Sequence, residues 1–251
     1  MESEEYQRTF ELETSHWWFR TVRGALVSLC QELPLRPGAA VLDAGCGTGR
    51  TLGLFEDGLG HQVYGFDIAS AAARYWQAQG ITRACRGSLQ AIPFSNGVFD
   101  AAFCLDVLEC AEVSEEAACR ELWRVLRLGG HAIVLVPAYR WLTNPAHHRV
   151  VHAVRRYRVS DLTALLERAG FSVIRATHLL MTTLPAMAAY RFWRRAVRGP
   201  DGRQPQSDLF RLPWALNEGL CRALAWERGW CVRRNLPWGS SLVAVARKDS
   251  E

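Results

Sequence analysis

The segment Ala39–Arg50, AAVLDAGCGTGR, limits the possible folds of this chain more than any other stretch. It begins with an apolar run typical of a buried strand and continues with glycines at alternate positions, Gly45, Gly47 and Gly49. Because glycine lacks a Cβ, such a backbone can turn sharply and pass close to a ligand. A strand, a tight turn and a helix start in this order predict a parallel α/β sheet with a ligand at the carboxyl end of its first strand.

Strand and helix patterns alternate along the rest of the 251 residues. Further strands are predicted at 61–67, 82–88, 98–106, 131–137, 171–179 and 241–248. Helices are predicted at 69–80, 114–130 and 160–171, with polar residues at their starts and glycines at their ends. This alternation predicts one α/β domain with a mostly parallel sheet and helices on both faces.

The last two predicted strands are separated by about 60 residues, from Leu179 to Ser240, which is too long for a hairpin loop. This stretch contains two helical patterns, 184–198 and 212–234, joined by a polar segment rich in glycine and proline. Its many aromatic residues could form a lipophilic wall of an acceptor pocket. The alternatives are ordinary packing of the two helices, and attachment to a membrane surface through the basic segment YRFWRRAVR.

Two carboxylates indicate which ligand the glycine-rich turn binds. Asp43 stands before the turn, where a carboxylate suits a cation better than a pyrophosphate, and the spacing G-x-G-x-G differs from that of dinucleotide-binding turns. Asp67 ends the next strand, where a carboxylate can accept hydrogen bonds from both ribose hydroxyls. A ribose, a nearby cation and no phosphate indicate S-adenosylmethionine (SAM) and disfavour a nicotinamide cofactor.

Four segments resemble class I SAM-dependent methyltransferases in order and spacing: VLDAGCGTGR, GFDIA, AIPFSNGVFDAAFCLDVLE and ELWRVLRLGGHAIVLVPAY. The resemblance implies a Rossmann-like sheet of seven strands in the order 3-2-1-4-5-7-6, with the seventh strand antiparallel and a helical insertion between strands 6 and 7. We expect residues 1–36 to form an N-terminal helical lid, 37–178 and 240–251 the SAM-binding domain, and 179–239 a substrate cap. The segments HWWFR, RRY and LPWGSSLVAVARK also resemble a bacterial branch found beside carbohydrate and secondary-metabolism genes.

The resemblance also implies which residues contact SAM. The expected contacts are Asp43, Ala44, Gly45, Cys46 and Gly47 for the methionine part, Asp67 for the ribose, Ile68, Ser88 and Leu89 for adenine, and Leu105 and Asp106 beside the methyl group. Two positions depart from the family pattern. Ser88 stands where members commonly have an acid that bonds adenine, and Cys110 stands where many have a histidine.

Methyl transfer from a sulfonium requires mainly that a nucleophile be held about 3 Å from the methyl carbon, and a hydroxyl or amine also needs a base. The candidate bases are His147 and His148, which follow the predicted strand 131–137, and His16 near the N-terminus. Tyr157 and His178 are further candidates. Because histidines are often structural, the sequence leaves open which of these acts as the base.

The aromatic segment HWWFR, His16–Arg20, follows a polar, acidic run. We expect it to act as the hinge of a lid, with Trp17 or Trp18 over the cofactor or acceptor cleft and Arg20 paired with the SAM carboxylate. The alternative is that Trp18 and Phe19 only anchor the first helix to the sheet.

Composition narrows the location and the chemistry. The eight cysteines form no C-x-x-C pair, so we expect reduced thiols and no metal site. The chain has neither an apolar run of about 20 residues nor a secretory start, and this predicts a cytoplasmic location. The net charge of +5 is concentrated after residue 170, where 13 Lys and Arg face 6 Asp and Glu. This excess indicates a solvated basic face or an anionic partner.

The sequence therefore predicts a SAM-dependent methyltransferase that acts on a small, hydrophobic or aromatic metabolite and produces S-adenosylhomocysteine. Two alternatives remain: a SAM-binding protein without turnover, and a methyltransferase for a macromolecular or membrane-associated substrate. Nucleic acid is disfavoured, because the chain has no N-P-P-Y-type motif and no long basic stripe. The acceptor atom and the oligomeric state stay open.

Overall fold

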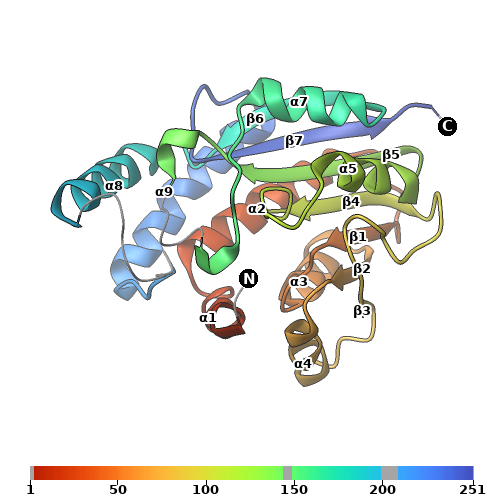
Figure 1. The fold of residues 1–251 in the computed structure, drawn as a ribbon, viewed down its shortest axis with the longest axis horizontal. Coiled ribbons are helices and arrows are strands. Elements are labelled where there is room, and N and C mark those ends of the chain that lie inside the picture. The colour runs from red at the N-terminus through yellow and green to blue at the C-terminus, as the bar shows by residue number, and fades with distance from the viewer. Residues whose placement is uncertain (1–2, 144–148, 199–208, 251) are drawn as a thin grey trace.

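The computed structural model describes residues 3–143, 149–198 and 209–250. Its centre is a seven-stranded sheet in the order β3-β2-β1-β4-β5-β7-β6 (Figure 1). Strand β7 pairs antiparallel with β5 and β6, and the other neighbouring strands pair in parallel. The predicted fold class, strand order and antiparallel seventh strand are confirmed.

The strands are β1 Ala40–Ala44, β2 Gln62–Asp67, β3 Ala84–Arg86, β4 Phe99–Leu105, β5 Leu126–Pro137, β6 Phe171–Leu179 and β7 Ser241–Lys248. The helices are α1 Ser3–Leu12, α2 Trp17–Gln31, α3 Arg50–Leu59, α4 Ser70–Ala78, α5 Glu115–Val125, α7 Val159–Arg168, α8 Leu184–Arg198 and α9 Trp214–Arg233, with a short 3₁₀ helix η1 at Arg140–Leu142.

Side chains of successive strand residues point to opposite faces of the sheet and create two core layers. Leu42 lies in the layer that packs against α5 and α7, whereas its neighbour Val41 lies in the layer formed with α2, α3 and α9. Both side chains are fully buried. A sheet buried on both faces explains why the strand sequences are almost continuously apolar.

Strand β5 begins earlier than the predicted residue 131. Leu126 directly follows α5 and pairs with Phe99, and after an irregularity the regular pairing starts with Ala101 opposite His131. Gly129 has φ +76°, a conformation that glycine adopts without strain, so it permits the irregular backbone between the two pairings.

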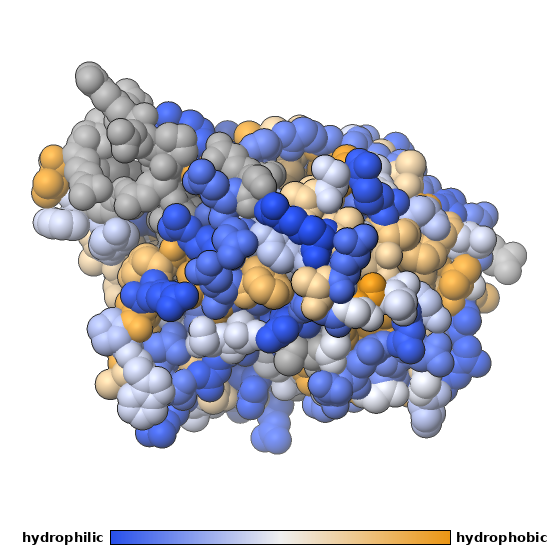
Figure 2. Space-filling view, turned by 90° about the horizontal axis from the view of Figure 1, so that it is seen from below, coloured by the Kyte–Doolittle hydropathy of each residue, from blue (hydrophilic) through white to orange (hydrophobic). Residues whose placement is uncertain are grey.

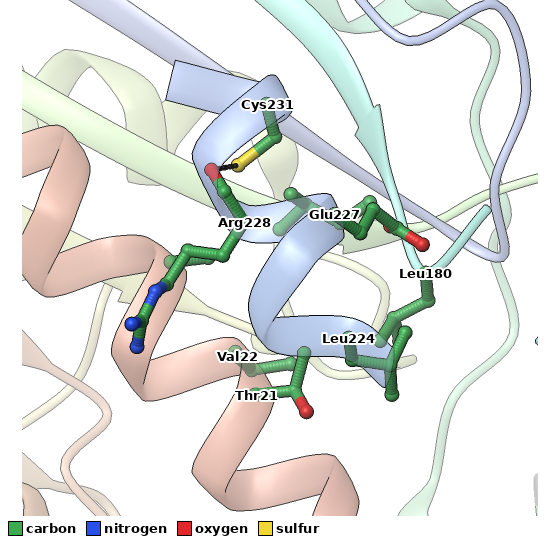
Figure 3. A pocket seen from close by; sticks show the side chains of 9 residues that line it. Thr21, Val22, Leu180, Leu224, Glu227, Arg228 and Cys231 are labelled. Carbon is green, nitrogen blue, oxygen red and sulfur yellow. Dashed lines mark hydrogen bonds between the residues drawn. The ribbon is translucent and has the colours of Figure 1, made fainter. Parts of the chain in front are cut away.

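The stretch between β6 and β7 contains the two predicted helices, α8 and α9. Strand β7 runs toward the C-terminus at the right of Figure 1, so the antiparallel β5 ends at the left, where α8 and α9 lie. Helix α9 packs on α2 and the end of β6 and leaves a cavity of only about 10 Å³, between Val22, Leu180 and Leu224 among others (Figure 3). A space of one water molecule marks a packed seam and not a ligand site.

A buried carboxylate fixes the start of α8 against α9. Glu227 of α9 accepts hydrogen bonds from the backbone N–H of Met181 at 2.8 Å and of Thr182 at 2.9 Å. The insertion is thereby joined to the end of β6 by charge-assisted hydrogen bonds. Within the described ranges, no helix is long and apolar enough to cross a bilayer.

Candidate active site

The turn after β1 is a sharp backbone loop held against β2. The N–H groups of Gly45 and Cys46 both donate to the carbonyl oxygen of Phe66 at 2.9 Å. Gly45 has φ +90° and Gly47 has φ +54°, values that favour glycine. A Cβ on Gly45 would lie 2.5 Å from a methyl of Val107, whereas a Cβ on Gly47 would meet no described atom within 4 Å. Gly45 is required for packing, and Gly47 leaves space for a ligand.

The carboxylate of Asp67, at the end of β2, organises this turn. Its Oδ2 accepts a hydrogen bond from the N–H of Gly47 at 2.9 Å. Its Oδ1 accepts from the N–H of Ala69 and from the hydroxyl of Tyr6, both at 2.9 Å. These bonds fix the carboxylate at the end of β2, the position expected for the residue that accepts from the ribose hydroxyls.

Asp43 is buried beneath the turn. Burial, together with the nearby charge of Asp67, raises its pKa to about 7. A carboxylate in such surroundings is ionised more readily when a cation lies beside it. The ammonium and sulfonium of SAM are groups of this kind, so Asp43 fits the expected ligand.

Helix α1 closes over the turn through two residues that the sequence analysis missed. Tyr6 donates to Asp67 and stacks on Tyr75 of α4, with ring centroids 6.4 Å apart. Both carboxylate oxygens of Glu13 accept from the hydroxyl of Thr48, at 2.8 and 2.7 Å. Burial raises the pKa of Glu13 to about 7, and the bond from Thr48 opposes this. Tyr6 lies on α1 and Glu13 directly follows its last residue, Leu12, and the spacing of seven residues, about two helical turns, was the available signal.

The outer side of α1 is polar. A groove of about 430 Å³ runs between α1 and residues 209–211, with Glu4, Arg8 and Glu11 in its wall. On the face of the molecule seen in Figure 2, hydrophobic residues lie in small groups between hydrophilic ones. Helix α1 therefore has a polar outer side and an inner side that packs on the turn.

The HWWFR segment starts α2 and does not itself cover the turn. His16 is the N-cap, and its Nδ1 accepts from the N–H of Trp18 at 3.3 Å. Burial lowers the pKa of His16, and its hydrogen bond to the Phe210 carbonyl opposes this. Both ring nitrogens are therefore engaged, so the expected role of His16 as a base gives way to helix capping. Trp17 and Trp18 are half-buried against the core layer of α2 and α9, and for Trp18 this is the anchoring expected in the alternative that named Trp18 and Phe19.

Two arginines of α2 are candidates for the cation that pairs with the SAM carboxylate, the expected Arg20 and Arg23. Arg20 forms an ion pair with Glu218 of α9, so its guanidinium is directed at the insertion. Arg23, one turn later, is half-buried near Glu13 and Arg50, and its buried Nη1 has no hydrogen-bond partner within the described part of the chain. A buried guanidinium nitrogen without a partner, next to the residue that binds Thr48, is available for an anion.

The residues expected around adenine lie beyond Asp67. Ile68 is 64% exposed, and a large apolar side chain in this position offers a surface for a flat ring. The hydroxyl of Ser88 accepts from the N–H of Gln90 at 3.2 Å, and the side chain of Leu89 is buried. Ala44 and Cys46 are buried in the core.

Leu105 and Asp106 lie at the carboxyl end of β4, as expected. Asp106 has φ +52°, a strained value for a residue with a side chain. Burial raises its pKa to about 7, and the charge of Arg156 opposes this shift. The candidate bases His147 and His148 lie outside the described residues.

A seven-stranded sheet in this order, with a glycine-rich turn after β1 and a carboxylate at the end of β2, is typical of the class I SAM-dependent methyltransferases. Residues 42–134 match the family described as "Methyltransferase domain", and this match supports the class I SAM-dependent methyltransferase superfamily with SAM as its cofactor.

Three comparisons illustrate the similarity. The chain is 26% identical over 192 residues, or 66% of its length, to 24-methylenesterol C-methyltransferase 2 of Oryza sativa subsp. japonica, and spans 52% of that protein. It is 35% identical over 109 residues, or 42% of its length, to malonyl-[acyl-carrier protein] O-methyltransferase of Herminiimonas arsenicoxydans, and spans 40% of it. The chain thus spans about half the length of these curated relatives.

The fold also matches a methyltransferase solved with the Haloferax volcanii Trm112 methyltransferase activator. The TM-score is 0.64 at 18% sequence identity, and the match covers 97% of this chain and 95% of the other. At this identity the likeness supports the fold alone.

Proposed function

We propose that this chain transfers a methyl group from SAM to a small-molecule acceptor of hydrophobic or aromatic character. The observation that carries the proposal is the carboxylate of Asp67, which is held by the turn at Gly47 and accepts a hydroxyl hydrogen bond from Tyr6. Similarity to methyltransferases named for a methylenesterol and for malonyl-[acyl-carrier protein] supports methylation of a group carried on a lipophilic or acyl molecule.

SAM supplies the methyl group as an activated sulfonium, so this chain mainly has to bind, orient and exclude water. Asp67 would hold the ribose, Asp43 would face the cationic part and Arg23 would pair with the carboxylate. Helix α1 would shield the site through Tyr6 and Glu13. The hydroxyl of Tyr6 donates to Asp67 Oδ1, an oxygen that the ribose would also use as an acceptor. When SAM binds, the Tyr6 hydroxyl must therefore move away or share this oxygen with the ribose.

The first experiment asks whether SAM binds and is used. Isothermal titration calorimetry measures SAM affinity, and release of S-adenosylhomocysteine in the presence of acceptors measures turnover. Binding with turnover supports the proposal. Binding without turnover on any acceptor favours the SAM-binding alternative, and absence of binding contradicts the proposal itself.

A second experiment compares two arginines on the same helix. Arg23→Gln should weaken SAM binding about tenfold or more, because a charge-assisted hydrogen bond contributes about 1.5–3 kcal/mol. Arg20→Gln removes only the ion pair with Glu218 and should leave the affinity within about twofold. If Arg20→Gln weakens SAM binding and Arg23→Gln does not, Arg20 and not Arg23 pairs with the SAM carboxylate.

Peripheral membrane contact is the second proposal, favoured by aromatic side chains on α8. Phe192 is 56% exposed and Trp193 is 61% exposed. Co-sedimentation with vesicles of anionic lipid should capture the protein, and the double change Phe192→Ser and Trp193→Ser should abolish capture. Leu128→Ser changes an equally exposed residue on β5 and should have no effect. Absence of capture of the unchanged protein rejects this proposal.

A further inference from the structure

The carboxyl ends of β5 and β6 bring together a tyrosine and a histidine that the steps above do not use. Tyr139 lies two residues after β5, and His178 is the second-last residue of β6. The Tyr139 hydroxyl lies 2.9 Å from Nε2 of His178, and Nδ1 of His178 lies 3.1 Å from the carbonyl oxygen of Leu236. A single chain of hydrogen bonds therefore leads from the tyrosine hydroxyl to the backbone before β7.

The partners of His178 determine its protonation. A carbonyl oxygen can only accept, so Nδ1 carries the hydrogen that is donated to Leu236. In the neutral ring Nε2 then has a lone pair and accepts from the Tyr139 hydroxyl. Burial lowers the pKa of His178, and the bond to Leu236 opposes this. The ring is neutral near pH 7 and can take up a proton at Nε2.

The backbone holds Tyr139 in an unusual conformation. Its φ is +54°, which costs about 1–3 kcal/mol for a residue with a side chain. Its N–H donates to the carbonyl of Tyr157 at 3.2 Å, and its hydroxyl oxygen accepts from the N–H of Gly239. The hydroxyl is thus fixed between one donor and one acceptor. Its second lone pair is left to accept a hydrogen bond from a ligand.

This pair lies at the same edge of the sheet as the expected position of the methyl group. The N–H of Asp106, at the end of β4, donates to the carbonyl of Leu135 near the end of β5 at 2.9 Å. The ends of β4 and β5 are therefore adjacent, and Tyr139 follows Leu135 by four residues. Ligands bind at these strand ends in open α/β sheets.

Aromatic rings form a flat wall beside the hydroxyl. Trp141 stacks on Tyr139 with centroids 5.7 Å apart and planes 24° apart. Phe192 of α8 stacks on Trp141 with centroids 6.1 Å apart and planes 12° apart. Trp141 remains 46% exposed. Nearly parallel rings with an accessible face favour a flat, aromatic acceptor.

We propose that Tyr139 and His178 form a proton relay for an aromatic acceptor that is methylated on a hydroxyl or an amine. This inference rests on the proposed function. The acceptor oxygen or nitrogen forms a bond to the methyl carbon, and the carbon–sulfur bond breaks with its electron pair left on sulfur. The acceptor proton passes to Tyr139 Oη while the proton of Tyr139 passes to His178 Nε2. Tyr139 is the catalytic residue, and His178, which acts through it, is a positioning residue.

The charged groups nearest the pair come from the neighbouring elements. Arg156 donates to the Ala138 carbonyl at 2.8 Å and its charge acts on Asp106, Arg175 donates to Asn235 at 3.0 Å, and Glu227 accepts from the backbone after β6. Because burial also raises the pKa of Asp106, to about 7, we assign to His178 the part of the acid limb of the rate profile that His178→Gln removes. The rate of methyl transfer should fall as the pH falls through the lowered pKa of His178, because the protonated ring cannot accept the proton of Tyr139.

The test uses the full chain, SAM and a panel of monocyclic phenols and arylalkylamines, with S-adenosylhomocysteine release as the readout. Tyr139→Phe and His178→Gln should each lower kcat about 100-fold or more, a normal contribution of acid–base catalysis, and should remove the acid limb. Both variants should keep the SAM affinity of the unchanged protein. Tyr64→Phe removes a tyrosine hydroxyl that bonds Gln62 on β2, and should leave kcat unchanged.

The outcomes separate this inference from the proposed function. Failure of the unchanged protein to bind SAM rejects the proposed function. Binding of SAM with methyl transfer to none of the panel, or only to an alkene carbon of squalene, rejects the acceptor class. Unchanged kcat and acid limb in Tyr139→Phe reject the relay. If His178→Gln does not fold, long-range ¹H–¹⁵N NMR of the unchanged protein decides, because a hydrogen on Nε2 and not on Nδ1 at pH 7 also rejects it.

Discussion

The cofactor end and the acceptor end of this sheet are built in different ways. At the cofactor end, Gly45, Gly47 and Asp67 form the site with backbone hydrogen bonds over 23 residues of chain. At the acceptor end, Tyr139 and His178 come from two strands and depend on the segment before β7. Local sequence therefore encodes the first site, whereas tertiary packing creates the second. A mutation that damages one of the two sites should therefore leave the other intact.

The largest expected effect is at the cofactor end. Asp67→Asn replaces the charged acceptor of the ribose hydroxyls with an amide and should weaken SAM binding about 100-fold, or about 2.7 kcal/mol. Calorimetry measures this, and the melting temperature without SAM should also fall, because the amide nitrogen cannot accept the hydrogen bonds that one of the two carboxylate oxygens receives. Asp57→Asn alters an exposed carboxylate on α3 and should bind SAM normally. An Asp67→Asn protein with normal affinity would remove Asp67 from the site.

The next effect concerns the stability of the acceptor end. Glu227→Ala leaves the backbone N–H groups of Met181 and Thr182 without their acceptor and should lower the free energy of unfolding by about 2–3 kcal/mol. Glu218→Ala, on the same helix, removes only the exposed ion pair with Arg20 and should cost at most about 1 kcal/mol. Urea unfolding measures both.

The same two variants test whether the ends are independent. SAM affinity should stay the same in Glu227→Ala, because α9 contributes no described contact to the turn at Gly47. A loss of affinity comparable with that of Asp67→Asn would show that the insertion and the cofactor site are one unit, and would contradict the comparison.

The difference between the ends also explains what the sequence could predict. The strands and the glycine-rich turn were predictable from short patterns of apolar and glycine residues, and the strand order from the resemblance to class I SAM-dependent methyltransferases. The partners of HWWFR were not, because Asn217 binds Trp17 and Glu218 binds Arg20 from 200 and 198 residues away. Helix propensity and spacing place these residues on α2, but they do not say which distant helix covers them.

A third effect is the pH dependence of SAM binding. Burial raises the pKa of Asp43 to about 7, so the carboxyl becomes protonated below that pH. Binding of a cation should then require loss of a proton, and the affinity should fall up to about tenfold for each pH unit below 7. Calorimetry in two buffers of different ionisation enthalpy should detect proton release at pH 6.

The effect of Asp43 on folding stability changes with pH in the opposite direction to its effect on SAM binding. Without SAM, the folded chain holds the Asp43 proton more tightly than the unfolded chain does, so this group lowers stability as the pH rises from about 4 to 7, and adds no further change above. Glu13 titrates in the same range, so the binding measurement is repeated with Glu13→Gln. If Glu13→Gln abolishes the proton release on SAM binding, the pH dependence of SAM affinity comes from Glu13 and not from Asp43.

The smallest effect tests the one adenine contact that departs from the family pattern. Ser88 already accepts from the N–H of Gln90, which places its oxygen at the turn after β3. Ser88→Asp offers a charged acceptor for the adenine amino group and should tighten SAM binding a few-fold, because a partly exposed bond contributes only about 0.5–1.5 kcal/mol. S-adenosylhomocysteine, which shares the adenine, should gain the same factor, whereas Gln90→Asp, two residues away and exposed, should change neither affinity. Equal affinities for unchanged protein and Ser88→Asp would place adenine away from this turn, and would leave Ile68 as the residue that defines the adenine side of the cofactor end.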